Sequence, residues 1–361
     1  MTRAFDFTPA DWARLERDWR AWWAGELKRP IVTIVTRDPG SYPPPGDDFL
    51  TRFPLDMPAE SVIDYFEARL LTQQFYADAV PKWWVNFGAG IAAAYLGAQL
   101  EYGTGTTWFH PLALENLADI HPVYDPENVW WRRTQEITRA AVNRWVQRGV
   151  MIAYTDLGGN LDILASLRGT ERLLFDVIEA PEEVDRLVRE ITALWLRFFD
   201  ENDKLFPPEQ HGRAAWAPPW SPGQGYMLQS DFCYMISPQM FERFVLPDLT
   251  ACCEAIEYPF YHMDGKGQLP HLDMLLSIEK LRGIQWQPGD GQPMADGWLD
   301  VLRRIRDAGK LCQVFVTLDG ALTIARELGG AGFLFDIQDQ GVPITEAEID
   351  RFFEALHRAG A

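Results

Sequence analysis

Apolar residues recur along the chain in two patterns, which predict helices alternating with buried strands. Apolar positions three and four residues apart predict helices, and these cover residues 60–75, 126–148, 181–204, 238–257, 269–278, 297–308 and 345–357. Short runs of mostly apolar residues lie before and between them and predict strands, and these cover residues 31–36, 150–154, 214–216, 226–228, 260–261, 283–286, 314–316 and 332–335.

Strands that are apolar at nearly every position are typical of a parallel sheet with helices on its faces. About eight strand and helix units fit this length, which favours an α/β fold of the TIM-type (β/α)8 barrel class over an open doubly wound sheet. The sequence contains no internal repeat and no low-complexity linker. We therefore predict a single barrel domain over residues 1–361.

The first 110 residues are the least regular part of the chain and predict an irregular N-terminal helical cap. Thr8, Pro9 and Asp11 form a helix start signal, with an N-cap residue, a proline in the first turn and an acid three residues after the cap. The apolar face of this helix carries Trp12, Leu15, Trp19 and Trp22. The proline-rich segment 41–46 is expected to be either a lid or rim of a site or a plain surface loop.

The charge balance excludes two classes of partner. The 361 residues include 33 Lys and Arg against 52 Asp and Glu, a formal net charge of −19. Such a surface repels nucleic-acid backbones and anionic membranes. No stretch approaches the roughly 18 apolar residues of a membrane span. We expect a cytoplasmic protein that binds a small-molecule substrate, and neither nucleic acid nor a membrane.

The cysteines predict reduced thiols rather than disulfides. There are four in the chain, and Cys252 and Cys253 are adjacent, which strains any bridge between them. No Cys-x-x-Cys pair occurs and the six histidines are scattered. We predict no structural zinc site, and a divalent metal is the one cofactor left open.

Polar residues follow four of the predicted strands, where a barrel carries its reactive groups. Asp156 follows the strand 150–154, and Gln229 and Asp231 follow 226–228. His262 and Asp264 follow the next strand, and Gln285 and Trp286 end the strand after that. If the barrel prediction holds, these side chains meet at one mouth.

Each of these residues also has a simpler interpretation. Asp156 and Asp264 precede glycines and could cap a helix or form a turn, and His262 could be a core histidine. Because His262 and Asp264 are two residues apart on an extended strand, their side chains point to the same side. We take Asp231, Asp264 and His262 as catalytic candidates, with Asp156 in reserve.

The chain contains 15 tryptophans, several at predicted strand ends or loops. Flat aromatic faces next to carboxylates and amides suit a polyhydroxylated ligand, because rings stack on its C–H faces while polar groups bind its hydroxyls. Core packing explains the same residues equally well. The substrate-binding candidates are Gln229, Gln285, Trp286, Trp216, Trp108 and Tyr261.

Four segments resemble the superfamily of uroporphyrinogen decarboxylases and corrinoid methyltransferases, especially its divergent uroporphyrinogen-decarboxylase-like members. They are Gln-Ser-Asp-Phe at 229–232, Ile-Ser-Pro-Gln-Met-Phe and the residues after it at 236–247, Tyr-His-Met-Asp-Gly at 261–265 and Gly-Lys at 309–310. The resemblance covers the chain loosely from about residue 60 onward. It implies a TIM barrel with its site at the carboxyl ends of the strands, a homodimer, and, for a methyltransferase, a corrinoid protein as partner.

The chain departs from both main branches of that superfamily. Uroporphyrinogen decarboxylases carry an Arg-Gln-Ala-Gly-Arg segment near the N-terminus, whereas the nearest stretch here, 36–40, has the single arginine Arg37. The zinc methyltransferases use a His-x-Cys pair and a distant cysteine. Here the pair is His262 and Asp264, and no cysteine follows the strand 332–335. A metal at this position would therefore be one that accepts harder ligands.

Three functions remain open from the sequence. The first is acid/base hydrolysis of a carbohydrate or polyol by the paired carboxyls of Asp231 and Asp264, as in a glycosidase. The alternative is a corrinoid-linked methyltransferase with His262 and Asp264 around a metal, or uroporphyrinogen decarboxylation by the same scaffold. The third is a barrel that binds a metabolite without catalysis.

Overall fold

The computed structural model describes residues 1–38, 40–41, 47–103, 105–338 and 343–360. Apart from residue 41, the proline-rich segment predicted as a lid or loop lies outside the described residues. Within the described part, the buried apolar side chains form one core cluster.

The main sheet has eight strands in the order β1-β3-β2-β14-β13-β12-β11-β10. The five strands from β10 to β14 and the strand β2 pair in parallel, whereas β3 pairs antiparallel with β2 and β1. Their bounds are β1 Thr2–Arg3, β2 Ile31–Arg37, β3 Gln73–Ala77, β10 Gly225–Gln229, β11 Tyr258–Asp264, β12 Gly283–Gln287, β13 Leu311–Val316 and β14 Phe333–Ile337. The protein is thus an α/β protein with a mixed sheet that is mostly parallel.

Three short sheets accompany the main one. β4 (Lys82–Trp84) pairs in parallel with β7 (Met151–Ala153). β8 (Arg213–Ala214) and β9 (Trp220–Ser221) form an antiparallel pair, as do β5 (Gln99–Gly103) and β6 (Thr106–His110). The backbone N–H of Tyr154, just after β7, donates to the carbonyl of Ala214 in β8 (2.9 Å), which connects two of these pairs.

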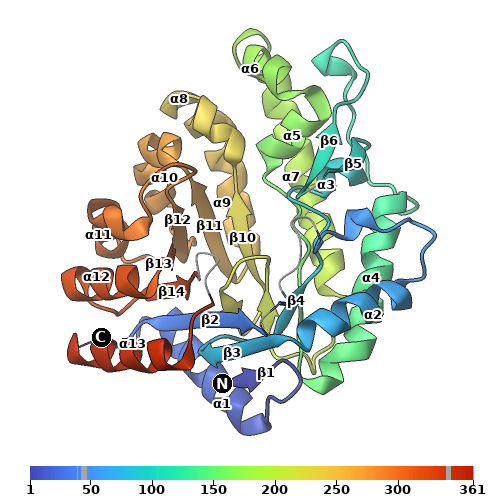
Figure 1. The fold of residues 1–361 in the computed structure, drawn as a ribbon. Coiled ribbons are helices and arrows are strands. Elements are labelled where there is room, and N and C mark those ends of the chain that lie inside the picture. The colour runs from blue at the N-terminus through green and yellow to red at the C-terminus, as the bar shows by residue number, and fades with distance from the viewer. Residues whose placement is uncertain (39, 42–46, 104, 339–342, 361) are drawn as a thin grey trace.

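Thirteen α-helices lie in the described residues, and α11, α12 and α13 lie outside the strands β12 to β14 in Figure 1. Their bounds are α1 Pro9–Trp23, α2 Ala59–Leu70, α3 Ala92–Tyr95, α4 Val129–Trp145, α5 Asn160–Arg168, α6 Thr170–Glu179, α7 Pro181–Asp203, α8 Pro238–Phe244, α9 Leu246–Ala255, α10 Leu272–Ser277, α11 Leu299–Asp307, α12 Leu318–Leu328 and α13 Glu346–Arg358.

The helix α1 begins as its sequence predicts and lies at the amino ends of strands. Thr8 and Asp11 form a reciprocal capping box, and the four predicted apolar side chains are buried. The indole Nε1 of Trp22 donates to the carbonyl of Phe333, the first residue of β14 (3.1 Å). The Trp23 indole donates to Trp220, the first residue of β9 (2.6 Å). The helix therefore covers the end of the sheet opposite to the polar strand ends.

Several predicted elements differ from the structure for local reasons. The predicted helix 60–75 ends at Leu70, because the chain then pairs with β2 as β3. The predicted helix 238–257 breaks into α8 and α9, since Pro247 in the first turn of α9 cannot continue the preceding helical hydrogen bonds. The predicted strand 214–216 is displaced to Arg213–Ala214. The helices α3, α5, α6 and α12 were not predicted.

No helix within the described ranges has the length and apolar character needed to cross a bilayer.

Candidate functional site

The strands β10, β11 and β12 bring the predicted polar residues to one edge. In their parallel register Gln229 lies beside His262, and His262 lies beside Gln285. Because the three strands run in the same direction, the residues that follow them emerge at the same carboxyl edge. Asp231 begins the short 3-10 helix Asp231–Met235 directly after β10. The sequence prediction that these strand ends meet holds for this group.

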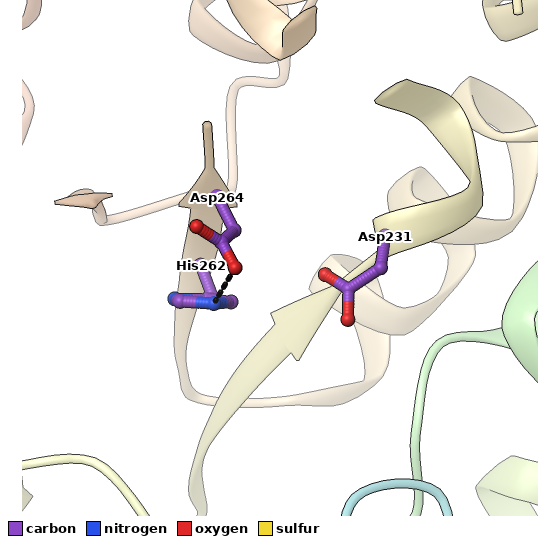
Figure 2. Close-up of side chains that lie close together, drawn as sticks. All are labelled: Asp231, His262 and Asp264. Atoms are coloured by element: carbon purple, nitrogen blue, oxygen red, sulfur yellow. Dashed lines mark ion pairs between the residues drawn. The ribbon is translucent and has the colours of Figure 1, made fainter. Parts of the chain in front are cut away.

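Asp231, His262 and Asp264 form a compact group at this edge (Figure 2). One ligand atom from each residue lies within 4.8 Å of the other two. The Nε2 of His262 is 3.8 Å from the Oδ2 of Asp264. Asp231 is exposed, and the other two are half-buried. A small molecule or ion can therefore reach all three side chains from solvent.

A buried chain of amides fixes the imidazole of His262. The Oε1 of Gln285 can only accept a hydrogen bond, so the Nδ1 of His262 donates to it. Gln285 in turn donates through Nε2 to the Oε1 of Gln313, and both glutamines are fully buried. The Nε2 of neutral His262 is thereby left without a proton and available as a ligand.

The charges of the group act on one another. Burial lowers the pKa of His262, but the nearby carboxylates of Asp264 and Asp231 outweigh burial and raise it. Protein around the carboxylate of Asp231 removes part of its hydration and raises its pKa. The imidazole of His262, when protonated, opposes that rise and the charge of Asp264 adds to it. Electrostatically, the group favours a bound cation.

Two further carboxyls lie behind the group. Asp162 accepts the backbone N–H groups of Asp231 (2.9 Å) and Phe232 (2.6 Å), which holds the start of the 3-10 helix. Burial, with the charge of Asp231 adding, raises the pKa of Asp162 to about 7. Asp156 accepts the N–H of Gly158 (2.9 Å), and burial raises its pKa to about 7.

The remaining predicted residues fall into two sets. The Nε2 of Gln229 lies 3.5 Å from the Oδ1 of Asp156. The indole of Trp216 contacts the His262 ring edge to face, with centroids 5.0 Å apart. Because Gln229 also lies beside His262 in register, both residues border the group of three.

Tyr261, Trp286 and Trp108 are not brought to this group. Tyr261 alternates with His262 along β11 and donates to Gln268 in the interior (3.0 Å). Trp286 lies beside Met263 in register, which places it on the side opposite to Gln285, and it is fully buried. Trp108 is 58% exposed on the hairpin strand β6.

Asp162 and Gln313 were missed by the sequence analysis. Gln313 lies in the otherwise apolar run of β13, and a lone polar residue in a buried strand is the signal that could have revealed it. Asp162 lies in the first turn of α5, a helix that the apolar spacing did not reveal, so no sequence signal marked it.

The donor set fits a divalent metal that accepts nitrogen and oxygen ligands. One imidazole and two carboxylates suit zinc, manganese or iron. Ligand atoms about 2.1 Å from a metal lie at most about 4.2 Å apart, so the group needs only a small inward shift. The four cysteines are buried outside it, so this set contains no thiolate.

No protein-family model matches the sequence, and no curated protein matches it. Among solved structures, the chain is similar to a methyltransferase from Methanosarcina mazei. The TM-score is 0.60 at 13% sequence identity, and the match covers 96% of this chain and 99% of that one. At this identity the likeness shows a shared fold.

Proposed function

We propose that the protein is a metal-dependent methyltransferase built as a single TIM-type barrel of the uroporphyrinogen decarboxylase and corrinoid methyltransferase kind. The observation that carries the proposal is the group of Asp231, His262 and Asp264, with His262 held by Gln285, at the carboxyl edge of parallel strands. The structural likeness to a methyltransferase over almost the whole chain supports it.

The three residues would hold the metal through one imidazole nitrogen and two carboxylate oxygens. When bound, a divalent metal lowers the pKa of an acceptor thiol and so favours its nucleophilic form near neutral pH. Gln285 is a positioning residue that keeps the Nε2 of His262 free. Asp162 holds the backbone from which Asp231 projects.

The proposed reaction moves a methyl group from a methylated corrinoid to a small thiol. The cobalt–carbon bond breaks with both electrons remaining on cobalt, which leaves cobalt(I). A sulfur–carbon bond forms from the thiolate, and the thiol proton leaves to solvent. The corrinoid protein is the proposed partner, and the small thiol is the acceptor substrate.

Glycosidic hydrolysis is the weaker interpretation of the same residues. It uses Asp231 and Asp264 as an acid and base pair and gives no role to the amide chain behind His262. Trp108, Trp286 and Tyr261, which were to bind the sugar, do not lie in the group. The arrangement of the group therefore favours metal binding over hydrolysis.

The test measures metal affinity and methyl transfer together. Metal-free protein is titrated with Zn²⁺ and Mn²⁺ by calorimetry and assayed with methylcobalamin and 2-mercaptoethanol, following the loss of the methylcobalamin spectrum. We expect tight binding of one metal ion and turnover that depends on it. Asp231→Asn, Asp264→Asn and His262→Gln should each weaken metal binding at least tenfold and lower turnover.

Matched controls lie elsewhere on the surface. Asp290→Asn, in the exposed loop after β12, and His357→Gln, exposed on α13, change the same residue types and should leave both readouts unchanged. The proposal fails if metal binding is no weaker in the three site variants than in these controls. It also fails if the metal-loaded protein does not consume methylcobalamin.

A further inference from the structure

A second group of polar side chains lines a cavity on the other side of Trp216. The cavity has a volume of about 440 Å³, within the range of small-molecule sites. Lys82 at the start of β4 and Asp336 in β14 provide its charges. Its apolar wall includes Val35, Phe315 and Ile337.

The carboxylate of Asp336 already has partners for both oxygens. The hydroxyl of Thr33 donates to Oδ1 (2.5 Å), and the amide of Gln338 donates to Oδ2 (2.8 Å). Burial raises its pKa to about 6, so at neutral pH it is charged and attracts the ammonium of Lys82. The negative charge of this cavity is therefore satisfied from within the protein.

Unlike the carboxylate of Asp336, two hydrogen-bond donors of residues that line the cavity lack partners within the described part of the chain. The Lys82 ammonium has three N–H groups and gives two to the carbonyls of Ala215 (3.2 Å) and Ala217. The buried indole Nε1 of Trp216 has no hydrogen-bond partner among the described residues. An unpaired buried donor gains a hydrogen bond when an acceptor comes beside it, so a ligand acceptor next to this indole is favoured.

Trp216 connects this cavity to the metal-binding candidates. It lines the cavity, and its ring contacts the imidazole of His262 with centroids 5.0 Å apart. Trp216 therefore borders both the cavity and the group of Asp231, His262 and Asp264.

We propose that this cavity binds the carboxylate of a small organic acid through the free N–H of Lys82 and the indole N–H of Trp216, with its methylene chain against Val35, Phe315 and Ile337. The inference rests on the proposed function, because it identifies the acceptor thiol as one that also carries a carboxylate. Under this proposal Lys82 and Trp216 bind the substrate and take no part in the chemical step.

The test compares acids with their neutral amides. ω-Hydroxy acids of four to six carbons and the corresponding amides are titrated into metal-free protein in the presence of a chelator, with binding followed by ligand-observed NMR. Because the metal is absent, any preference for the acid arises from the protein. We expect at least one acid to bind about tenfold or more tightly than its amide.

Two variants test whether Lys82 and Trp216 cause the preference for the acid over its amide. Lys82→Met should weaken acid binding about tenfold and leave amide binding nearly unchanged, and Trp216→Phe should weaken acid binding while keeping an aromatic wall. Lys204→Met removes an exposed lysine of the Lys204 and Asp200 pair and is the matched control. If Lys82→Met does not fold, because it loses the contacts to Ala215 and Ala217, Trp216→Phe decides alone.

The outcomes separate this inference from the proposed function. Equal binding of every acid and its amide, or an unchanged acid preference in both variants, overturns the subsite. Lys82→Met should keep the metal affinity of the unmodified protein. In the unmodified protein, absence of an acid preference with metal binding and methylcobalamin turnover intact would refute only the subsite, whereas an acid preference without metal binding would refute only the methyltransferase proposal.

Discussion

The Nδ1 of His262 donates its hydrogen bond to the side chain of Gln285, the residue beside it in the parallel register of β11 and β12. When it is neutral, a histidine held in this way presents its other nitrogen as a lone pair. That nitrogen faces Asp264 at 3.8 Å. The pairing of two neighbouring strands thus sets which nitrogen of neutral His262 carries the proton, and so which nitrogen can bind a metal.

Replacement of Gln285 tests this relationship. Gln285→Met keeps a side chain of similar length and removes the acceptor for Nδ1, so His262 can rotate or change tautomer. We expect metal affinity to fall about 10- to 100-fold, the usual effect of losing an outer hydrogen-bond partner. Calorimetric titration with Zn²⁺ measures it.

The control for this experiment is Gln99→Met, at an exposed position of the hairpin strand β5. It should bind metal as the unmodified protein does. An unchanged affinity in Gln285→Met, with thermal stability similar to that of the control, would show that Gln285 does not orient His262.

A close backbone approach supports the same site. A Cβ atom at Gly159 would overlap the carbonyl oxygen of Gln229 at the end of β10 and the carboxylate of Asp162. Gly159→Ala should therefore push apart β10 and the start of α5, with a loss of about 1–3 kcal/mol in unfolding free energy. Because Asp231 follows Gln229 by two residues, metal affinity should fall as well. Urea unfolding and metal titration on the same samples measure both, and full retention of stability would contradict the packing argument.

The first helix provides a test of stability away from the site. Thr8→Ala removes the hydroxyl that accepts the N–H of Asp11 and should cost about 1 kcal/mol of unfolding free energy. Thr345→Ala removes the equivalent capping box of α13 and gives a matched comparison. Neither variant should change metal affinity, because the cap hydrogen bonds of Thr8 and Thr345 are made within their own helix starts. Thermal unfolding and metal titration check the two statements.

The sequence predicted the parts of this protein that depend on local patterns. The start of α1 could be predicted because Thr8 and Asp11 are a local signal. The polar ends of β10 to β12 could be predicted because each directly follows an apolar run. His262 and Asp264 were paired correctly because the alternation of a strand is strict. These signals need no knowledge of distant contacts.

The missed features depend on contacts between distant segments. Lys82 and Asp336 lie 254 positions apart and meet only because β4 and β14 border one cavity. Trp286 and Tyr261 were assigned to substrate binding because their residue types suit it, yet strand register places both in the interior. The register between strands is set by the whole sheet, so composition alone could not decide which side each ring takes.

The buried carboxyl of Asp248 predicts how stability varies with pH. It lies in the first turn of α9, and its Oδ1 has no hydrogen-bond partner among the described residues. Burial raises its pKa to about 8, well above that of an unfolded chain. The folded protein therefore holds a proton that the unfolded chain has released between about pH 4 and 8. The stability that this group contributes is full below about pH 4 and is lost as the pH rises toward 8.

Asp248→Asn removes the ionisation, so the unfolding free energy of this variant relative to the unmodified protein should rise by up to about 1.4 kcal/mol per pH unit between about pH 5 and 8. Urea unfolding at pH 5, 7 and 9 measures the difference, and Asp290→Asn, at an exposed position, should follow the unmodified protein. Parallel curves for Asp248→Asn and the unmodified protein would show that Asp248 is charged in the fold.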